Sequence, residues 1–451
     1  MKLQRAYLTI VLCLALLLPL YGEQPTARSV PEWIRAGVIY EINPRTFSAT
    51  GDFRGIEARL DDLKKLGVSI LWLMPINPMG QLKKKGSIGS PYAVRDYYAI
   101  ISSYGTKEDL KRLLTEAHRR GLRVILDIVA NHTSWDSLLM KTPEFFKHDA
   151  AGNIVPPVSD WSDVASLDYS NQRLRAYMIE MLKFWLQEFD LDGFRCDVAG
   201  MIPTDFWETA RAELEKVKPD ILMLAEANSP ELLVKAFDLD YAWPFHTVLT
   251  DVIESGAPAS RIVESWEKER RRFPRGALEM RFSDNHDESR AIARFGERGS
   301  MAASALVFTM DGVPMLYNGM EVGDTTESGA PALFEKLPIF WQISERRPKF
   351  LPFYTQMIAL RKAHPALQQG ETEWVQNTEP ARILTYFRRG AGEDFFVAIN
   401  LSNRPFFGAA EVNAGHFEDV TPGLDSPKQR KATLPVLSLD AWEFRIFRSP
   451  H

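Results

Sequence analysis

The chain has 451 residues, of which 45% are hydrophobic and 25% are charged. This is the composition of an ordinary globular protein, and it excludes wholesale disorder, fibrous repeats and a short disulfide-rich scaffold. The 54 basic and 59 acidic side chains give a formal net charge of −5, which argues against a nucleic-acid-binding protein.

The first residues predict an export signal. Lys2 and Arg5 precede an almost wholly apolar run over residues 6–20. The run is shorter than the roughly 20 residues of a membrane-spanning helix. We therefore expect residues 1–22 to be a signal peptide, with export to the periplasm or the medium and no membrane span in the mature chain. An uncleaved membrane anchor is the alternative. Cleavage would leave Cys196 without a partner for an internal disulfide.

From residue 33 onward, short apolar runs alternate with amphipathic segments such as 106–121, in which leucines recur at helical spacing. Parallel strands need helical crossovers and are buried on both faces. Eight strand–helix units therefore predict a (β/α)8 TIM barrel over residues 33–369, with a doubly wound open sheet as the alternative. The eight apolar runs are 38–42, 69–74, 123–129, 192–198, 221–227, 238–243, 277–283 and 312–318.

Two segments depart from this alternation. Residues 133–170, after the third strand, are irregular and polar, and we expect them to form a short inserted domain within the barrel. After a predicted helix at 350–367, residues 370–451 alternate apolar and polar positions between Gly, Asn and Pro. This pattern predicts a C-terminal antiparallel β-sandwich domain.

Polar residues gather where the predicted barrel strands end, at the edge where enzymes of this fold carry their active sites. These residues are Asp127, Asn131 and His132 after the third strand, Arg195 and Asp197 after the fourth, Glu226 after the fifth, and His286 and Asp287 after the seventh. Three carboxylates, those of Asp197, Glu226 and Asp287, are thereby expected at one mouth.

Crowded carboxylates have pKa values that are driven apart. Arg195 precedes Asp197 by two residues and shares its face of the strand, so we expect it to keep that carboxylate ionised as a nucleophile. Two alanines flank Glu226, and we expect an apolar environment to keep it protonated as a general acid. Two carboxylates in these roles are the machinery of glycoside hydrolysis.

Two other function classes fit part of this residue set. His132, His286 and the aspartates are also ligand types of a catalytic metal in barrel amidohydrolases or isomerases. No His-x-His pair follows the first strand, however, and Arg195 beside Asp197 would repel a cation. A non-catalytic barrel that serves as an interaction module is the second alternative; loss of a catalytic carboxylate would mark it, and all three are present.

Four segments in chain order resemble the four motif regions of the α-amylase family, glycoside hydrolase family 13: DIVANH at 127–132, GFRCDVA at 193–199, LAEA at 224–227 and SDNHD at 283–287. The resemblance runs from about residue 33 to the end. It implies a retaining α-glycoside hydrolase that cleaves α-glucosidic bonds of maltodextrin- or starch-type glucans by double displacement. A transglycosylase that uses the same covalent intermediate is the alternative activity.

The same resemblance implies a role for each matching residue. Asp197 would be the nucleophile, Glu226 the general acid/base and Asp287 the residue that binds and distorts the sugar. Arg195 would orient the nucleophile, and Asp127 would have a structural or hydrogen-bonding role near the centre. The substrate-binding positions would be Tyr92, which matches a stacking tyrosine, and His132 and His286, which match ligands of sugar hydroxyls.

The expected partner is therefore an α-glucan oligosaccharide or polysaccharide, and no cofactor is needed for the chemistry. Asn131 matches one calcium ligand of the family, but Gly200 and Met201 stand where many members carry Lys-His, and Ser166 replaces an expected Asp. The case for structural calcium is therefore weak. Endo or exo action, α-1,4 or α-1,6 preference and oligomeric state stay open.

Two further features lie near the expected cleft. Trp161 is one of four tryptophans that are candidate sugar platforms, with core packing as the more common role of such residues. The basic run at 83–85 is interpreted as a solvated loop beside the cleft.

Overall fold

A computed structural model of the protein describes residues 24–330, 332–390, 392–413, 415–423 and 434–450, so the predicted signal peptide lies outside the described residues. Parallel strands close into a barrel in the order β1-β10-β9-β8-β7-β6-β3-β2. Each coincides with a predicted run, which confirms the (β/α)8 barrel and makes the open-sheet alternative wrong. The barrel strands are β1 (Ile39–Ile42), β2 (Ile70–Leu73), β3 (Arg123–Ile128), β6 (Gly193–Cys196), β7 (Leu222–Ala225), β8 (Leu239–Tyr241), β9 (Glu279–Arg281) and β10 (Val313–Tyr317).

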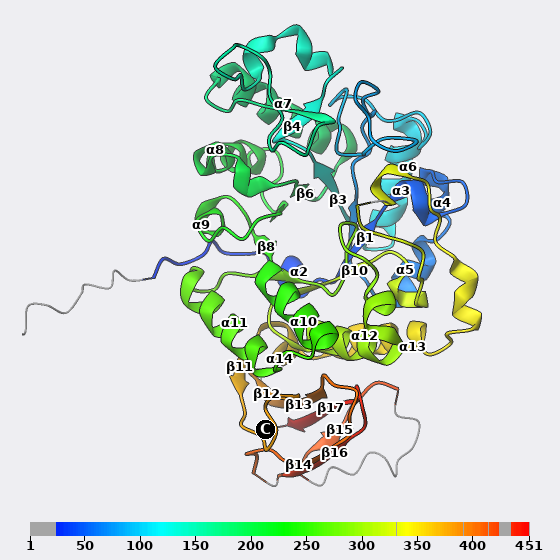
Figure 1. The fold of residues 1–451 in the computed structure, drawn as a ribbon, viewed down its shortest axis with the longest axis vertical. Helices are drawn as coiled ribbons and strands as arrows, with labels where there is room; N and C mark the ends of the chain where they lie inside the picture. The colour runs from blue at the N-terminus through cyan, green and yellow to red at the C-terminus, as the bar shows by residue number, and fades with distance from the viewer. Residues whose placement is uncertain (1–23, 331, 391, 414, 424–433, 451) are drawn as a thin grey trace, which may run out of the picture.

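Helices surround the barrel (Figure 1). Helix α6 starts at a capping box between Thr106 and Asp109, and α5 ends at Gly67 in the left-handed conformation, with φ of 100°. No helix of the described residues is apolar over a length that would cross a bilayer. The α-helices are α2 (Glu32–Arg35), α3 (Pro44–Phe47), α4 (Phe53–Glu57), α5 (Leu60–Leu66), α6 (Lys107–Arg119), α7 (Gln172–Phe189), α8 (Thr204–Glu215), α9 (Leu232–Lys235), α10 (Trp243–Ser255), α11 (Ser260–Arg272), α12 (Ala291–Thr309), α13 (Phe350–Ala363) and α14 (Pro365–Gln369).

Strands β6 and β7 approach each other closely at Gly193. A Cβ atom there would lie 1.9 Å from the carbonyl oxygen of Leu222, so only glycine fits. The pairing sets Cys196, a buried free thiol, opposite Ala225. The residues that follow the two strands, Asp197 and Glu226, therefore emerge side by side at the same edge of the barrel.

The segment between β3 and α7 adds a small antiparallel pair to the mouth of the barrel. Strand β4 (His132–Ser134) pairs with β5 (Val164–Ser166), and His132 lies opposite Ser166. The short 3-10 helices η1 (Leu138–Lys141) and η2 (Pro143–Phe145) lie between them. In Figure 1 this segment and the C-terminal sheets lie at opposite ends of the molecule.

The C-terminal region is antiparallel, as expected. A five-stranded sheet in the order β11-β12-β13-β17-β15 and a two-stranded sheet, β14-β16, contribute side chains to one small apolar cluster. The buried guanidinium of Arg388 on β12 connects this region to helix α12 of the barrel by donating to the carbonyl oxygen of Thr309 at 3.3 Å, and it also donates to the carbonyl oxygen of Gly370 at 2.7 Å. The strands are β11 (Glu371–Trp374), β12 (Ile383–Gly390), β13 (Glu393–Asn400), β14 (Phe406–Ala409), β15 (Glu418–Asp419), β16 (Val436–Leu439) and β17 (Phe444–Pro450).

Candidate active site

The carboxyl ends of the barrel strands surround a cavity of about 370 Å³. The segments that follow β3, β6, β7, β9 and β10 and the loop after β2 contribute residues to its wall. Among the residues predicted from the sequence, the wall contains Tyr92, His132, Asp197, Glu226, His286 and Asp287. The fold thus brings together six side chains that span about 200 positions of the chain.

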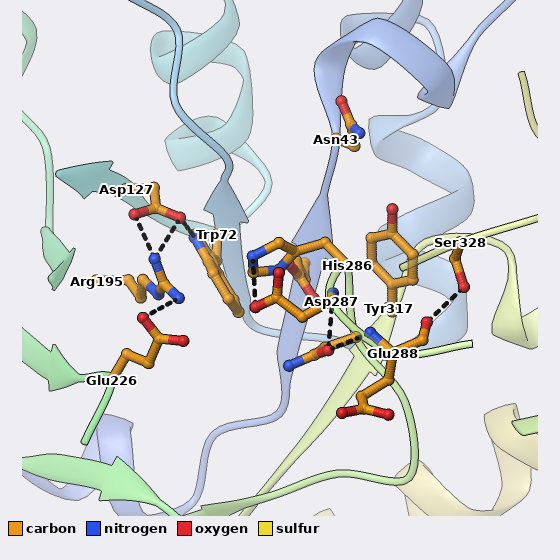
Figure 2. A network of polar contacts seen from close by, with 12 residues as sticks. Asn43, Trp72, Asp127, Arg195, Glu226, His286, Asp287, Glu288, Tyr317 and Ser328 are labelled. Atoms are coloured by element: carbon orange, nitrogen blue, oxygen red, sulfur yellow. Dashed lines mark hydrogen bonds and ion pairs between the residues drawn. The ribbon is translucent and has the colours of Figure 1, made fainter. Parts of the chain in front are cut away.

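Arg195 lies fully buried beneath this cavity and holds three carboxylates at once. Its Nη1 lies 2.9 Å from Asp127 Oδ1 and 3.0 Å from Asp197 Oδ1, and its Nη2 lies 2.9 Å from Glu226 Oε2. Figure 2 shows the guanidinium between Asp127 and Glu226. The sequence predicts a contact of Arg195 with Asp197 alone. In the structure Arg195 also contacts Asp127 on β3 and Glu226 after β7, because neighbouring barrel strands direct side chains of one layer towards each other.

The two oxygens of Asp197 have different surroundings. Oδ1 accepts from Arg195, whereas Oδ2 is buried and has no hydrogen-bond partner among the described residues. Burial raises the pKa of Asp197 well above its usual range, and the neighbouring Glu226 carboxylate raises it further, with Arg195 acting in the opposite direction. Arg195 thus favours the ionised form of Asp197, as expected, but burial and the Glu226 carboxylate act against it and raise the pKa in the free protein.

Glu226 accepts a hydrogen bond from the backbone N–H of Val198 at 2.7 Å, besides its contact with Arg195. The apolar environment predicted from its flanking alanines is therefore wrong. Sequence neighbours on a strand point to the opposite face, so they do not define what surrounds a strand side chain. Val198 holds this donor in place with a left-handed backbone, φ 37° and ψ 46°, which is rare for a β-branched residue.

His286 contacts Glu41 on β1 on one side and the cavity-wall residues Tyr92 and Asp287 on the other. Its Nδ1 donates to Glu41, and its Nε2 lies 2.7 Å from the Tyr92 hydroxyl and 3.2 Å from Asp287 Oδ2. The Tyr92 ring stacks on it with centroids 5.4 Å apart. Burial opposes ionisation, but the carboxylates of Asp287 and Glu41 raise the pKa of His286 to about 9. The imidazolium therefore carries a charge at neutral pH. Glu41 was not assigned to the site from the sequence, although a polar residue at the end of the first strand was a signal for it.

Asp127 and Arg195 support the cavity from below and do not reach its wall. Asp127 accepts from Trp72 Nε1 at 3.2 Å and from the Tyr92 hydroxyl at 3.1 Å (Figure 2 shows the Trp72 contact). Burial raises the pKa of Asp127 to about 6. Arg195 Nε donates to the Tyr241 hydroxyl at 3.2 Å. Tyr241, on β8, is not among the predicted site residues because the run at 238–243 has a weak strand pattern.

His132 and Trp161 form another part of the wall. Their rings meet edge to face with centroids 5.5 Å apart, and His132 Nε2 lies 3.8 Å from Asp197 Oδ2. Burial lowers the pKa of His132 to about 4, so this ring is neutral at pH 7. The site thus contains one neutral imidazole, His132, and one charged imidazole, His286, at the cavity wall.

Asn131 does not have the surroundings of a calcium ligand. Its Nδ2 lies 3.3 Å from His132 Nδ1 and 4.0 Å from Met201 Sδ. No group of three or more His, Cys, Asp or Glu side chains in the described ranges is arranged to hold a metal ion. Calcium prefers six or more oxygen ligands. The donors around Asn131 therefore do not fit calcium, and we assign no step to a metal.

The chain matches a known family model and several known proteins. Residues 37–149 and 158–342 match the family model described as alpha amylase, catalytic domain. The chain is 29% identical over 400 residues to alpha-amylase MalA of Haloarcula japonica, with 83% of this chain and 57% of that protein covered, so it spans just over half of that relative. It is 27% identical over 402 residues to the intracellular maltogenic amylase of Bacillus subtilis, covering 79% and 66%.

Solved structures show the same likeness. The noncanonic maltogenic alpha-amylase AmyB from Thermotoga neapolitana superposes with a TM-score of 0.80 and 30% identity, covering 92% of this chain and 97% of that one. An alpha-amylase from Lactobacillus plantarum gives a TM-score of 0.82 and 32% identity, with coverage of 92% and 99%.

Proposed function

The chain belongs to the α-amylase family of glycoside hydrolases, and from this premise we propose that it hydrolyses α-glucosidic bonds of maltodextrin- or starch-type glucans with retention of configuration. The observation that carries the proposal is the sharing of Arg195 by Asp197 and Glu226, with Asp197 Oδ2 beside the cavity and without a hydrogen-bond partner among the described residues. One guanidinium holds the two carboxylates close together, as double displacement requires.

In the first step, Asp197 Oδ2 attacks the anomeric carbon of the bound sugar. The glycosidic C–O bond breaks as Glu226 transfers a proton to the leaving oxygen, and a covalent glycosyl–Asp197 ester forms. Arg195 keeps Asp197 Oδ1 fixed, so that Oδ2 is the oxygen free to react. The acid proton required on Glu226 removes one negative charge from the carboxylate cluster, and this loss favours the ionised form of Asp197.

In the second step, Glu226 accepts a proton from water as the water oxygen bonds to the anomeric carbon. The ester bond to Asp197 breaks, and the sugar leaves with its original configuration. His286 and His132 bind hydroxyls of the reacting ring, Tyr92 stacks on it, and Asp287 binds and distorts it. Because the pKa of His286 is about 9, the imidazolium also supplies a positive charge near Asp287 at neutral pH.

The experiment that tests this proposal is hydrolysis of maltoheptaose by the wild type and by Asp197→Asn, with the anomer of the first products followed by NMR. We expect α-anomers first and a loss of at least about 10³-fold in kcat for the variant. Asp220→Asn, the same change at an exposed site, is the control and should retain full activity. Undiminished activity of Asp197→Asn would overturn the nucleophile assignment, and initial β-anomers would overturn retention.

Export is a separate proposal that rests on residues 1–22 alone. The Bacillus subtilis relative is named as intracellular, and that name describes the relative. Expression of the full chain in a bacterial host, followed by fractionation and N-terminal sequencing, tests it. A product outside the cytoplasm that begins near Glu23 is the expected result. A cytoplasmic product that retains Met1 would contradict it.

A further inference from the structure

The loop after β2 crosses one side of the active-site mouth. We call residues 80–90 the bridge loop; its base is closed by a backbone hydrogen bond from Gly80 N–H to the carbonyl oxygen of Ala93 at 2.8 Å. The basic run at 83–85 forms part of this loop. The sequence interpretation of a solvated run does not describe Lys85, whose ammonium group is engaged with the opposite wall.

On one side, the bridge loop is attached to the segment inserted after β3. Lys85 Nζ donates to the carbonyl oxygen of Asp160 at 2.7 Å and lies 3.2 Å from Asp163 Oδ1. The Asp163 side chain is 8% exposed and the Lys85 side chain 37% exposed, so the carboxylate end of this pair is shielded from water while the ammonium end is partly open to it. Lys83 Nζ lies 3.6 Å from the ring centroid of Trp135, which adds a second attachment to the same segment.

On the other side, the bridge loop is attached to the segment after β10. Ser87 N–H donates to Glu335 Oε1 at 2.9 Å, and Ile88 N–H donates to the carbonyl oxygen of Phe334 at 3.2 Å. Gly86 packs so closely on Phe334 that a Cβ atom would lie 2.3 Å from the Phe334 Cβ. The loop is therefore held at both ends.

The strand order shows which side of the mouth is crossed. The bridge connects the segments after β3 and β10 and passes over β2 and β1, which lie between them in the barrel. Glu226 follows β7, on the opposite half of the ring, which the bridge leaves open. Glu226 protonates the leaving group, so the leaving part of the glucan extends over the open half. Asp197 follows β6, which lies between β7 and the bridged strands on that side of the ring, so a glucan whose leaving part extends past Glu226 has its retained part on the bridge side.

We propose that the bridge loop closes the end of the cleft that receives the non-reducing side of the glucan, so that the protein releases short saccharides from chain ends. This inference rests on the proposed function. Lys85, Asp163 and Phe334 all line the cavity, so the attached loop forms its wall. The whole cavity has a volume of about 370 Å³, near the lower limit for small-ligand sites, roughly 300–1,000 Å³.

The test uses maltoheptaose labelled at its reducing end, at low concentration and early times. Every unlabelled fragment then comes from the non-reducing side of the cleaved bond. For the wild type we expect unlabelled glucose or maltose, with the label moving stepwise to shorter chains. The double variant Lys85→Ala/Glu335→Ala removes the ion pair with Asp163 on one side and the Glu335 carboxylate on the other, and should release unlabelled fragments of three or more units.

Two further proteins complete the experiment. Lys84→Ala/Glu345→Ala removes the same charges from exposed positions that do not attach the loop across the cleft, and should keep the wild-type product pattern. Replacement of residues 82–87 by two glycines shortens the bridge itself and should give the longer fragments even if the backbone contacts of the double variant suffice to hold the loop. Thermal unfolding checks that each variant is folded.

The outcomes separate the two proposals. Wild-type release of mainly long unlabelled fragments would overturn the bridge assignment while leaving α-glucan hydrolysis intact. An unchanged product pattern in both the double and the shortened variant would also overturn it. No cleavage of maltoheptaose by the wild type would instead overturn the proposed function, and with it the inference that rests on it.

Discussion

The backbone N–H of Val198 donates to Glu226 Oε2 at 2.7 Å, across the ends of the paired strands β6 and β7. The residue directly after Asp197 thereby orients the carboxylate proposed as acid/base. Val198 adopts a left-handed backbone with φ of 37° to do so. Strained backbone of this kind persists where the surrounding structure demands it, and here it serves the geometry of two catalytic carboxylates.

The strain at Val198 leads to a first prediction. Val198→Gly should raise the free energy of unfolding by about 1 kcal/mol, because relief of a strained φ, worth about 1–3 kcal/mol, exceeds the entropic cost of glycine, about 0.5–1 kcal/mol. The freed loop should hold Glu226 less firmly and lower kcat. Urea unfolding and steady-state kinetics measure both. Val158→Gly, at a position without positive φ, should be destabilising; the same loss in Val198→Gly would refute the strain argument.

The charge on His286 leads to a second prediction. In the wild type the ring should remain protonated at pH 8, because the carboxylates of Asp287 and Glu41 raise its pKa to about 9. Glu41→Gln should lower this pKa towards about 6.5, the value for an unperturbed histidine. Titration of the ring by NMR with labelled histidine follows the change. If the His286 ring of the wild type is already neutral at pH 7, the carboxylates of Asp287 and Glu41 do not raise its pKa as expected.

The same pKa has a consequence for stability. A group whose pKa is raised on folding stabilises the protein fully below its unfolded pKa, about 6.5, and loses that contribution as the pH rises through the folded pKa, about 9. The wild type should therefore lose about 3 kcal/mol of this contribution between pH 6 and 10, and Glu41→Gln much less. Urea unfolding at the two pH values, with the difference compared between the two proteins, measures the effect. Equal losses would contradict it.

Tyr241 leads to a third prediction, as a positioning residue for Arg195. Tyr241→Phe removes the acceptor of the Arg195 Nε hydrogen bond and should lower kcat about tenfold with little change in KM, because hydrogen bonds to charged groups contribute about 1.5–3 kcal/mol. The pH profile of kcat/KM should shift as well, since Arg195 contacts both Asp197 and Glu226. Tyr354→Phe, which loses a buried contact with Ser304 far from the site, should lose stability and keep its pH profile. If Tyr241→Phe keeps the wild-type pH profile of kcat/KM, as Tyr354→Phe should, then Tyr241 has only a packing role.

Metal removal provides a fourth prediction. The donors near Asn131 do not fit calcium, so exhaustive dialysis against EDTA should leave both the melting temperature and the rate of maltoheptaose hydrolysis unchanged. Added Ca²⁺ should have no effect on either. A fall in melting temperature that calcium alone restores would show that oxygen donors elsewhere in the chain complete a site.

The sequence by itself predicted the eight strands, because buried parallel strands leave apolar runs that can be read locally. It also placed Asp197 and Glu226 on adjacent strands, since one strand–helix unit separates them. It assigned their surroundings wrongly. Glu226 contacts Arg195 and the backbone N–H of Val198, and Arg195 serves Asp127 and Glu226 besides Asp197.

Only the tertiary structure decided the contacts that depend on closure of the ring. Glu41 meets His286 although 245 residues separate them, because β1 pairs with β10 to complete the barrel. Ser87 meets Glu335 across 248 residues for the same reason, and this contact closes one side of the cleft. Local patterns of polarity determine which segments become strands. Which distant side chains share a charge or enclose a cavity follows only from the order in which those strands pair.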